Sequence, residues 1–359
     1  MIKIIITIII THLFLSSNGQ VQNHADVNSI IDSKKEYVIS ATDSIPKNTF
    51  KDPLFFIEGQ LCQHLRKIFQ DSRGNIWFGT NVYGVMLYDG KTLQYFDEKD
   101  GFIGGRITAI LEDKVGNIWF GTASGLSKYD GQSFSHFTME KEVWNNEVWS
   151  VMIDKQDKIW VGTTESVYIF DGTNFQDFEL PKPTIKTSNY IYSQDRIVSI
   201  LEDKNGHIWF GRSGYGICKY DGQSFTHFTI KNGLADNVIY EMMFDKKGNL
   251  WIGTFFGGVS QYDGETFTNF TKDGIVDGEE VSGFFEDANG DIWFAAENHG
   301  VCRYRNNEFT NYYKEANLPT NGILSIYKDI QNRFWFGGWG GLFRFENEKF
   351  ISITKVDFK

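Results

Sequence analysis

The sequence is poor in cysteine and proline, and its basic residues are outnumbered by acidic ones. Cys62, Cys218 and Cys302 are the only 3 cysteines among 359 residues, and an odd number does not indicate a disulfide framework. We therefore expect three buried thiols. Lysine and arginine total 35 and aspartate and glutamate total 46, so the formal net charge is −11 at pH 7. Such a chain lacks a basic stripe that would neutralise phosphates, so nucleic acid is not an expected partner.

Long apolar runs are also missing, except at the N-terminus. Residues 1–19 contain Lys3, about a dozen mostly apolar residues, and then the small polar residues Ser17, Asn18 and Gly19. This order predicts a signal peptide cleaved after Gly19 and a periplasmic or secreted protein. An uncleaved anchor is the alternative, and no other segment predicts a membrane span. Residues 20–60 are polar without periodicity, which predicts a flexible leader.

A repeat fills the rest of the chain. Each of its seven copies has an aspartate six residues before a tryptophan and a glycine, or once an alanine, two residues after it. The tryptophans are Trp77, Trp119, Trp160, Trp209, Trp251, Trp293 and Trp335. They are 42, 41, 49, 42, 42 and 42 residues apart, and a period of about 40 to 45 residues is typical of a propeller blade. Residues 61–359 therefore predict an all-β fold, a seven-bladed β-propeller of four-stranded antiparallel blades.

The second copy shows how one blade is expected to form. Its four strands are expected at residues 107–112, 118–122, 126–129 and 134–138. Asp113 and Asp130 open the two hairpin turns, because aspartate accepts hydrogen bonds from turn N–H groups and each is followed by a glycine that tolerates positive φ. We expect the tryptophan and the phenylalanine of the fourth strand to pack between neighbouring blades.

Two irregularities accompany the repeat. The third copy carries an insertion at residues 180–194, which explains the single 49-residue step and falls in the connection to the next blade. Residues 54–57 could add a strand to the last blade, but residues 350–354 already fill its fourth strand. Whether the ring closes by strand exchange therefore stays open at this point.

Comparison of the copies separates the repeat framework from candidate binding residues. The hairpins opened by aspartate should lie on one face of the propeller, where the sequence is uniform. The loops after the tryptophan strand and the connections between blades should lie on the other face. That face varies from copy to copy, so we expect it to bind the ligand.

Two groups of residues on the variable face are candidates for binding. The loops contribute aromatic and charged residues that suit stacking on sugar rings or gripping a peptide: Tyr83, Arg212, Tyr215, Phe255, Phe256, Glu297, His299 and Trp339. The innermost strands contribute a ring at the mouth of the channel: His64, Arg106, Glu147, Arg196 and Glu280. Some of the aromatic rings could instead fold down onto the blades, and the charged ring could instead form mutual ion pairs.

Signals for catalysis are weak. The sequence has no nucleophile elbow, no zinc-binding histidine pattern and no phosphate-cradling glycine loop. Glu297 and His299 form the best available acid–base or metal pair. The seven turn aspartates do not cluster enough oxygen ligands for calcium. No catalytic residue, metal or cofactor is therefore predicted, and a non-enzymatic role is favoured over an enzymatic one.

Residues 107–138 carry a resemblance to a known family. They follow the pattern I-x-x-I-L-E-D-x-x-G-N-I-W-F-G-T-x-x-G-L-x-K-Y-D-G-x-x-F-x-x-F-T, which is similar to the two-component regulator propeller repeat and recurs in register over residues 61–359. Such repeats are known from the exported sensor region of hybrid histidine kinases in Bacteroidetes-type bacteria, where they are associated with glycan sensing. The resemblance implies an exported ligand-sensing or interaction module of sensor type, with an oligosaccharide as one candidate ligand and an envelope protein as another, here without a kinase or DNA-binding domain of its own.

Two other functions compete with this interpretation. An envelope scaffold could use the same aromatic-rich loops to grip a partner protein. A metal-dependent enzyme is the other alternative, because the repeat is also similar to the streptogramin lyase type of propeller, which uses a histidine and a metal on one face. Only Glu297 and His299 suggest the latter function.

Overall fold

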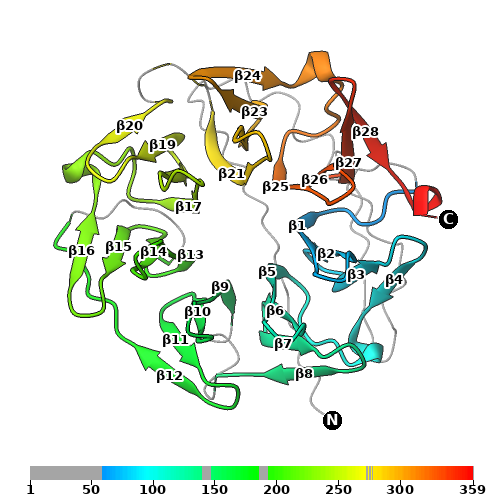
Figure 1. The fold of residues 1–359 in the computed structure, drawn as a ribbon, viewed down its shortest axis with the longest axis horizontal. Coiled ribbons are helices and arrows are strands. Elements are labelled where there is room, and N and C mark those ends of the chain that lie inside the picture. The colour runs from blue at the N-terminus through cyan, green and yellow to red at the C-terminus, as the bar shows by residue number, and fades with distance from the viewer. Residues whose placement is uncertain are drawn as a thin grey trace, which may run out of the picture. The chain divides into compact units, whose positions relative to one another are not determined.

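The computed structural model describes residues 59–139, 147–185, 193–271, 274, 276 and 278–358. Seven four-stranded antiparallel sheets surround a central axis, and each sheet consists of four consecutive strands (Figure 1). The predicted seven-bladed propeller is therefore confirmed. The predicted signal peptide and nearly all of the predicted leader lie outside the described residues, so these boundaries stay predictions.

The blades are numbered one to seven in chain order, and each runs from an inner strand at the channel to an outer strand. The strands are β1 (Leu65–Gln70), β2 (Ile76–Thr80), β3 (Val85–Tyr88), β4 (Leu93–Phe96), β5 (Ile107–Glu112), β6 (Ile118–Thr122), β7 (Gly125–Tyr129), β8 (Phe134–Phe137), β9 (Val148–Ile153), β10 (Ile159–Thr163), β11 (Val167–Phe170), β12 (Phe175–Phe178), β13 (Ile197–Glu202), β14 (Ile208–Arg212), β15 (Gly216–Tyr220), β16 (Phe225–Phe228), β17 (Ile239–Phe244), β18 (Leu250–Thr254), β19 (Val259–Tyr262), β20 (Phe267–Asn269), β21 (Glu279–Glu286), β22 (Ile292–Glu297), β23 (Gly300–Arg305), β24 (Glu308–Tyr312), β25 (Ile323–Lys328), β26 (Phe334–Gly338), β27 (Gly341–Glu346) and β28 (Lys349–Ile353).

The repeated aspartate and tryptophan are joined by a hydrogen bond in every blade. In blade two the indole Nε1–H of Trp119 donates to Oδ2 of Asp113 at 2.9 Å, while Oδ1 accepts the backbone N–H of Val115 and Asn117. Burial of Asp113 favours its protonated form, but the bonds from Trp119 and Asn117 outweigh burial and lower its pKa. The aspartate thus fixes the hairpin and the orientation of the tryptophan together.

Each tryptophan packs at a seam between blades, as expected. In blade four, Trp209 stacks on Phe228 of the outer strand, with 5.4 Å between ring centroids. Its other neighbours include Phe244 and Tyr262 of blade five. Large aromatic rings bury about 150–250 Å² each, so these seams supply much of the core.

Hydroxyl groups on the inner strands connect consecutive blades. Ser150 Oγ donates to the carbonyl oxygen of Ile197 at 2.8 Å, and Thr108 Oγ1 donates to that of Val148 at 2.9 Å. Lys67 and Glu241 stand at the position of Ser150 in blades one and five, and their side chains form an ion pair across the channel at 3.3 Å. Small residues elsewhere in this layer leave room for that pair.

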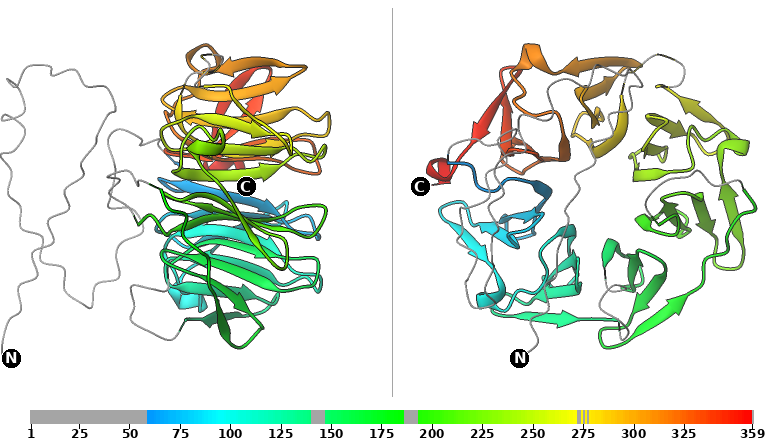
Figure 2. Two further views of the ribbon diagram at one scale, coloured as in Figure 1. Left: turned by 90° about the vertical axis from the view of Figure 1, so that its left-hand side faces the viewer. Right: turned by 180° about the vertical axis from the view of Figure 1, so that it is seen from behind.

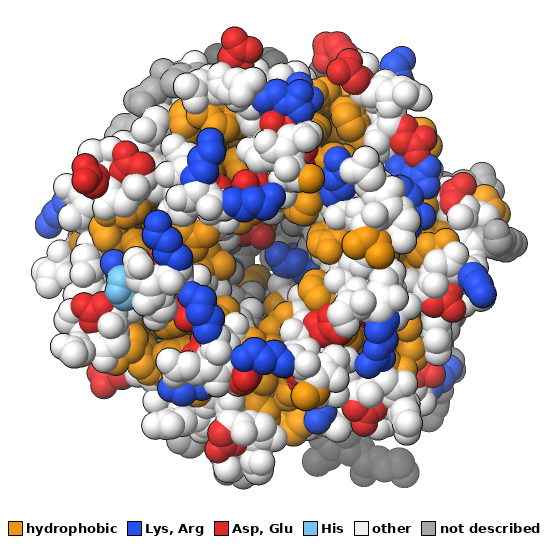
Figure 3. All heavy atoms as spheres, viewed as in Figure 1, with side chains coloured by type: hydrophobic (Ala, Val, Ile, Leu, Met, Phe, Trp, Pro, Cys, Tyr) orange, Lys and Arg blue, Asp and Glu red, His pale blue; other side chains and the backbone are white. Residues whose placement is uncertain are grey.

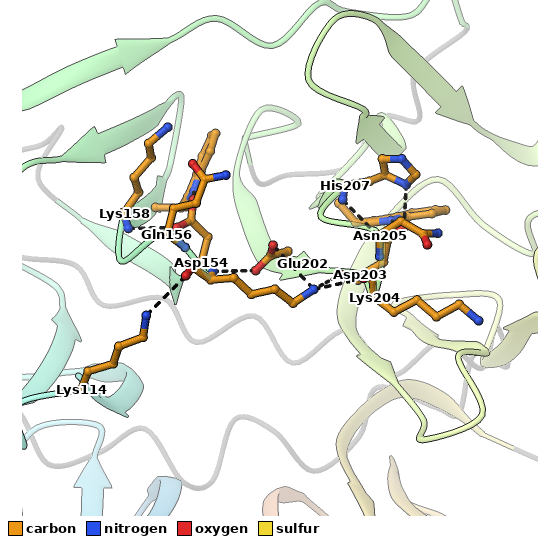
Figure 4. Close-up of polar contacts among 12 residues, drawn as sticks. Lys114, Asp154, Gln156, Lys158, Glu202, Asp203, Lys204, Asn205 and His207 are labelled. Atoms are coloured by element: carbon orange, nitrogen blue, oxygen red, sulfur yellow. Dashed lines mark hydrogen bonds and ion pairs between the residues drawn. The ribbon is translucent and has the colours of Figure 1, made fainter.

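The turns between the first and second and between the third and fourth strands lie on one side of the propeller, here named the hairpin face. Acidic and basic side chains are interspersed over it around a central opening (Figure 3). Many of them link blades: the Lys155 backbone N–H donates to Glu202 Oε2 at 2.8 Å, and Lys155 Nζ donates to the Asp203 carbonyl oxygen at 2.8 Å (Figure 4). This face is therefore occupied by contacts that hold the repeat together.

The ring closes without strand exchange among the described residues. Gln60 forms a single antiparallel bridge with Thr354, next to β28. A 3₁₀ turn, η6 (Lys355–Phe358), then brings Phe358 against Trp335 of blade seven and Tyr88 of blade one, with ring centroids 6.3 and 4.7 Å apart. Residues 54–57, which could have supplied an extra strand, lie outside the described residues.

The three cysteines are free and buried, as expected. Burial raises the pKa of Cys62 to about 12 and that of Cys218 to about 11, so both remain thiols at neutral pH.

Replacement of Phe358 by alanine tests the closure. Because Phe358 is 7% exposed and fills the seam between the last and first blades, Phe358→Ala should lower the free energy of unfolding by about 3 kcal/mol. Chemical denaturation followed by tryptophan fluorescence measures this. Ile351→Ala, at a side chain 45% exposed in the same blade, should change it by less than about 0.5 kcal/mol. Equal effects of the two variants would contradict the closure by Phe358.

Candidate functional site

The loops between second and third strands and the connections between blades lie opposite the hairpin face, and we name this side the connection face. It is the side seen in the right-hand view of Figure 2. The chain enters each inner strand here, so the predicted ring residues stand at the mouth of the channel. The structure shows what each of these residues contacts.

Blades two to four bring three of the ring residues around one tryptophan. Arg106 and Glu147 form an ion pair. The guanidinium carbons of Arg106 and Arg196 lie 4.4 and 4.0 Å from the ring centroid of Trp149. The Trp149 Nε1–H donates to Glu147 Oε2 at 3.1 Å and lies 3.1 Å from Thr164 Oγ1. The ion-pair alternative therefore holds for Arg106 and Glu147, within a cluster that also contains an aromatic ring.

Blades seven and one bring His64 and Trp339 together. Their ring centroids are 4.5 Å apart with an interplanar angle of 47°. Gly322 is the member of the mouth ring in blade seven, and a Cβ atom there would lie 2.7 Å from Trp339 Cδ1. Glycine at this position therefore leaves space for the indole. Trp339 is half-buried, so part of its ring remains open to solvent.

Two carboxyl groups meet at the mouth beside blade six. Burial, a hydrogen bond with Glu297 and the charge of Glu297 raise the pKa of Glu280 well above its ordinary range. The pair therefore retains a proton at neutral pH. Phe255 and Phe256 lie nearby in one loop of blade five. The Glu280 N–H donates to the Phe255 carbonyl oxygen at 3.0 Å, and the centroids of the two phenylalanine rings are 4.8 Å apart.

Arg212 does not lie in the loop where the sequence predicted it. It ends strand β14 instead of lying in an exposed loop, and it is only 2% exposed. Its Nη2 donates to Asp195 Oδ1 at 2.6 Å and its Nη1 to the Pro181 carbonyl oxygen at 3.0 Å. Tyr215 lies beneath it, with the guanidinium carbon 4.6 Å from the ring centroid. Lys182 Nζ donates to the other oxygen of Asp195 at 2.8 Å.

A cavity of about 330 Å³ opens beside Arg212, between blades three and four. Its apolar wall consists of Val167, Phe178, Leu180 and Ile197. Its polar groups come from Arg212, Asp195, Lys182, Glu165, Glu179 and Ser166. The volume is at the lower end of the range for small-molecule sites, about 300–1,000 Å³.

The other candidate residues do not join these groups. Tyr83 is partly buried against the core of blade one, as the alternative for the aromatic residues proposed. His299 is exposed, and its backbone N–H donates to the Ala296 carbonyl oxygen. Over the part of the chain that the structure describes, no group of three or more His, Cys, Asp or Glu residues is placed to hold a metal ion.

Sequence reasoning missed Trp149, Asp195 and Lys182. Trp149 follows the mouth-ring position by two residues, where the other copies vary between residues such as Thr108, Val198 and Tyr240. That variability was the available signal for Trp149. The partners of Arg212 belong to the insertion and its edge, and spacing alone could not show that they fold back onto β14.

Glu280 should make stability depend on pH. Because its folded pKa is raised, the unfolded chain releases a proton above about pH 4.5 that the folded chain retains, so the free energy of unfolding falls as pH rises. Glu280→Gln keeps a donor toward Glu297 but does not titrate, and it should flatten this decline between about pH 5 and about pH 8. Urea denaturation across that range measures the slope. Glu308→Gln at an exposed site is the control, and an unchanged slope in Glu280→Gln would contradict the proton-sharing pair.

Comparison with known proteins gives one family. The family described as "Two component regulator propeller" matches residues 60–82, 101–124, 143–165, 191–211, 233–256 and 317–340. These segments fall in every blade except the sixth, where the sequence has Ala295 in place of the repeat glycine. Among curated proteins, none matches the sequence.

Several solved structures share the fold. A catalytically inactive virginiamycin B lyase from Staphylococcus aureus with quinupristin is 13% identical, with a TM-score of 0.62 over 78% of this chain and 93% of that chain. PorZ, a surface component of the type-IX secretion system of Porphyromonas gingivalis, is 16% identical, with a TM-score of 0.60 over 80% and 47%. The extracellular domain of a candidate hybrid two component system from B. thetaiotaomicron is 21% identical, with a TM-score of 0.45 over 80% and 39%. At these identities the lyase and PorZ support the fold alone, and the extracellular domain, with the lowest TM-score, supports no conclusion.

None of the helices in the described residues has the length and apolar character needed to cross a membrane.

Proposed function

The repeats of this chain belong to the two component regulator propeller family, and from that premise we propose that the protein is an exported, non-enzymatic binding module of sensor type. Its connection face would bind the ligand, and an oligosaccharide is the ligand class that we favour. The predicted signal peptide would place the protein in the periplasm or outside the cell. The signal would pass to a separate protein or to a part of the chain beyond the propeller.

The observation that carries this proposal is the set of aromatic rings held at the channel mouth beside charged groups. Trp339 keeps part of its ring open to solvent while His64 and Gly322 fix its position. A sugar ring stacks its apolar face on such a platform and places its hydroxyl groups against nearby carboxylates and guanidinium groups. The proton-sharing pair Glu280 and Glu297 and the cluster of Glu147 with Arg196 bring such polar groups to the same mouth.

The hairpin face offers a contrast. Its polar side chains and backbone groups form links between blades, as in the contacts of Lys155 with Glu202 and Asp203. Binding at the mouth would leave those links intact.

A glycan array tests the proposal with the protein from Gln20 onward. We expect a specific signal that Trp339→Ala weakens about tenfold or more, because truncation of a central aromatic contact typically costs over 1 kcal/mol. Val115→Ala, at a side chain 80% exposed on the hairpin face, should leave the signal unchanged. Equal loss in both variants would contradict binding at the mouth.

A partner protein is the second candidate, and exposed apolar side chains favour it. Val82, Ile103 and Phe256 are 63%, 45% and 44% exposed in loops and connections of the connection face. A blank array together with a partner that co-purifies through these residues would support the scaffold function and overturn the glycan proposal.

A further inference from the structure

Blade four departs from the repeat at one buried position. The residue after the glycine of the second strand is threonine in four blades: Thr80, Thr122, Thr163 and Thr254. Its hydroxyl donates to a carbonyl of the following turn, at 2.9 Å from Thr163 to Ser166. Blade four has Arg212 there, so this turn hydroxyl is lost and a guanidinium is buried instead. Burial of a charge costs several kcal/mol unless partners compensate. Arginine in place of threonine therefore brings the blade no evident gain in stability.

A second departure lies at the same seam. The connection from blade three to blade four is the one that carries the insertion, residues 180–194. Pro181 and Lys182 of this insertion, with Asp195 next to it, contact Arg212 or each other. Arg212 of blade four and the insertion after blade three therefore contact each other, and the cavity opens beside them between the two blades.

The charged side chains of the cavity form two groups. The buried Arg212 and the exposed Lys182 both pair with Asp195, so these three side chains carry one net positive charge. The Arg212 Nε–H is buried and has no acceptor among the described residues. Toward solvent, Glu165 and Glu179 are exposed and present carboxylate oxygens. The net positive group around Arg212 therefore favours an anionic acceptor, whereas the two glutamates accept hydrogen bonds from hydroxyl groups.

We propose that this cavity binds a sugar acid, with its carboxylate at Arg212 and its ring hydroxyls toward Glu165 and Glu179. A single six-membered sugar ring is of a size that about 330 Å³ can hold, and the apolar wall can cover one face of it. The inference rests on the proposed function in that it assigns a ligand class to the connection face. It uses a site separate from Trp339 at the channel mouth.

The test is calorimetric titration of the whole protein with D-galacturonate and D-glucuronate. D-galactose and D-glucose are matched probes that lack the carboxylate, and acetate is a probe that lacks the sugar. We expect both sugar acids to bind more tightly than either neutral sugar or acetate. Equal binding of the neutral sugars would overturn the role of the carboxylate, and equal binding of acetate would overturn the role of the sugar. No binding of the sugar acids would overturn the proposal altogether.

Arg212→Thr is the decisive variant because it introduces the residue that four other blades have at this position. It should weaken sugar-acid binding about tenfold or more, since hydrogen bonds to charged groups typically contribute about 1.5–3 kcal/mol. Arg212→Lys keeps the positive charge but lacks the paired N–H donors of the guanidinium, so its loss of sugar-acid affinity should be intermediate. This variant still tests the site if Arg212→Thr fails to fold. Lys114→Thr removes one positive charge on the hairpin face and should have no effect.

The two proposals can fail separately. Loss of sugar-acid binding in Trp339→Ala but not in Arg212→Thr would overturn the cavity site and leave the mouth as the binding site. Loss in Arg212→Thr alone would establish the cavity, whatever the array shows for Trp339.

Discussion

The hydrogen bond from a tryptophan indole to a turn aspartate is the interaction on which the propeller depends. It recurs in all seven blades, with lengths from 2.7 Å for Trp335 to 3.4 Å for Trp293. A buried indole N–H without an acceptor would cost free energy, and so would a buried carboxylate without donors. One contact satisfies both groups, and it also directs the ring toward the next blade. Local turn formation and the seam between blades are therefore coupled through one side-chain pair.

Because the aspartates lie at one end of each blade, the hairpin face and the connection face have different structural roles. The aspartates occupy the hairpin end of each blade, and contacts such as Lys155 with Glu202 add links between blades there. The opposite end carries none of these aspartate turns, so its residues can change without loss of the framework. The inner strands keep the blades together at that end through backbone-directed hydroxyls such as Ser150. Variation in the mouth residues is thus tolerated because the ring is held from elsewhere.

The sequence predicted the fold well because the period and the tryptophan register repeat in every copy. It predicted less where a residue lies outside the repeat or acts over a long distance in the chain. Phe358 closes the ring from beyond the last strand, and the Lys67–Glu241 pair joins residues in blades one and five. For the candidate site, the repeat register indicated which residues precede the inner strands, but it could not show which side chains they contact. Arg212 was expected in the loop that follows the tryptophan strand, whereas strand β14 continues through it.

Arg212 shows why departures from a repeat are informative when they are costly. A surface substitution in one copy says little, because a blade tolerates it at almost no cost. A buried guanidinium in place of a hydroxyl that makes a local bond requires compensation, and Asp195 and Pro181 supply part of it. The Nε–H still has no acceptor in the described part of the chain. A position where the framework gives up its own hydrogen bond and buries a guanidinium beside a cavity is where we propose that a ligand binds.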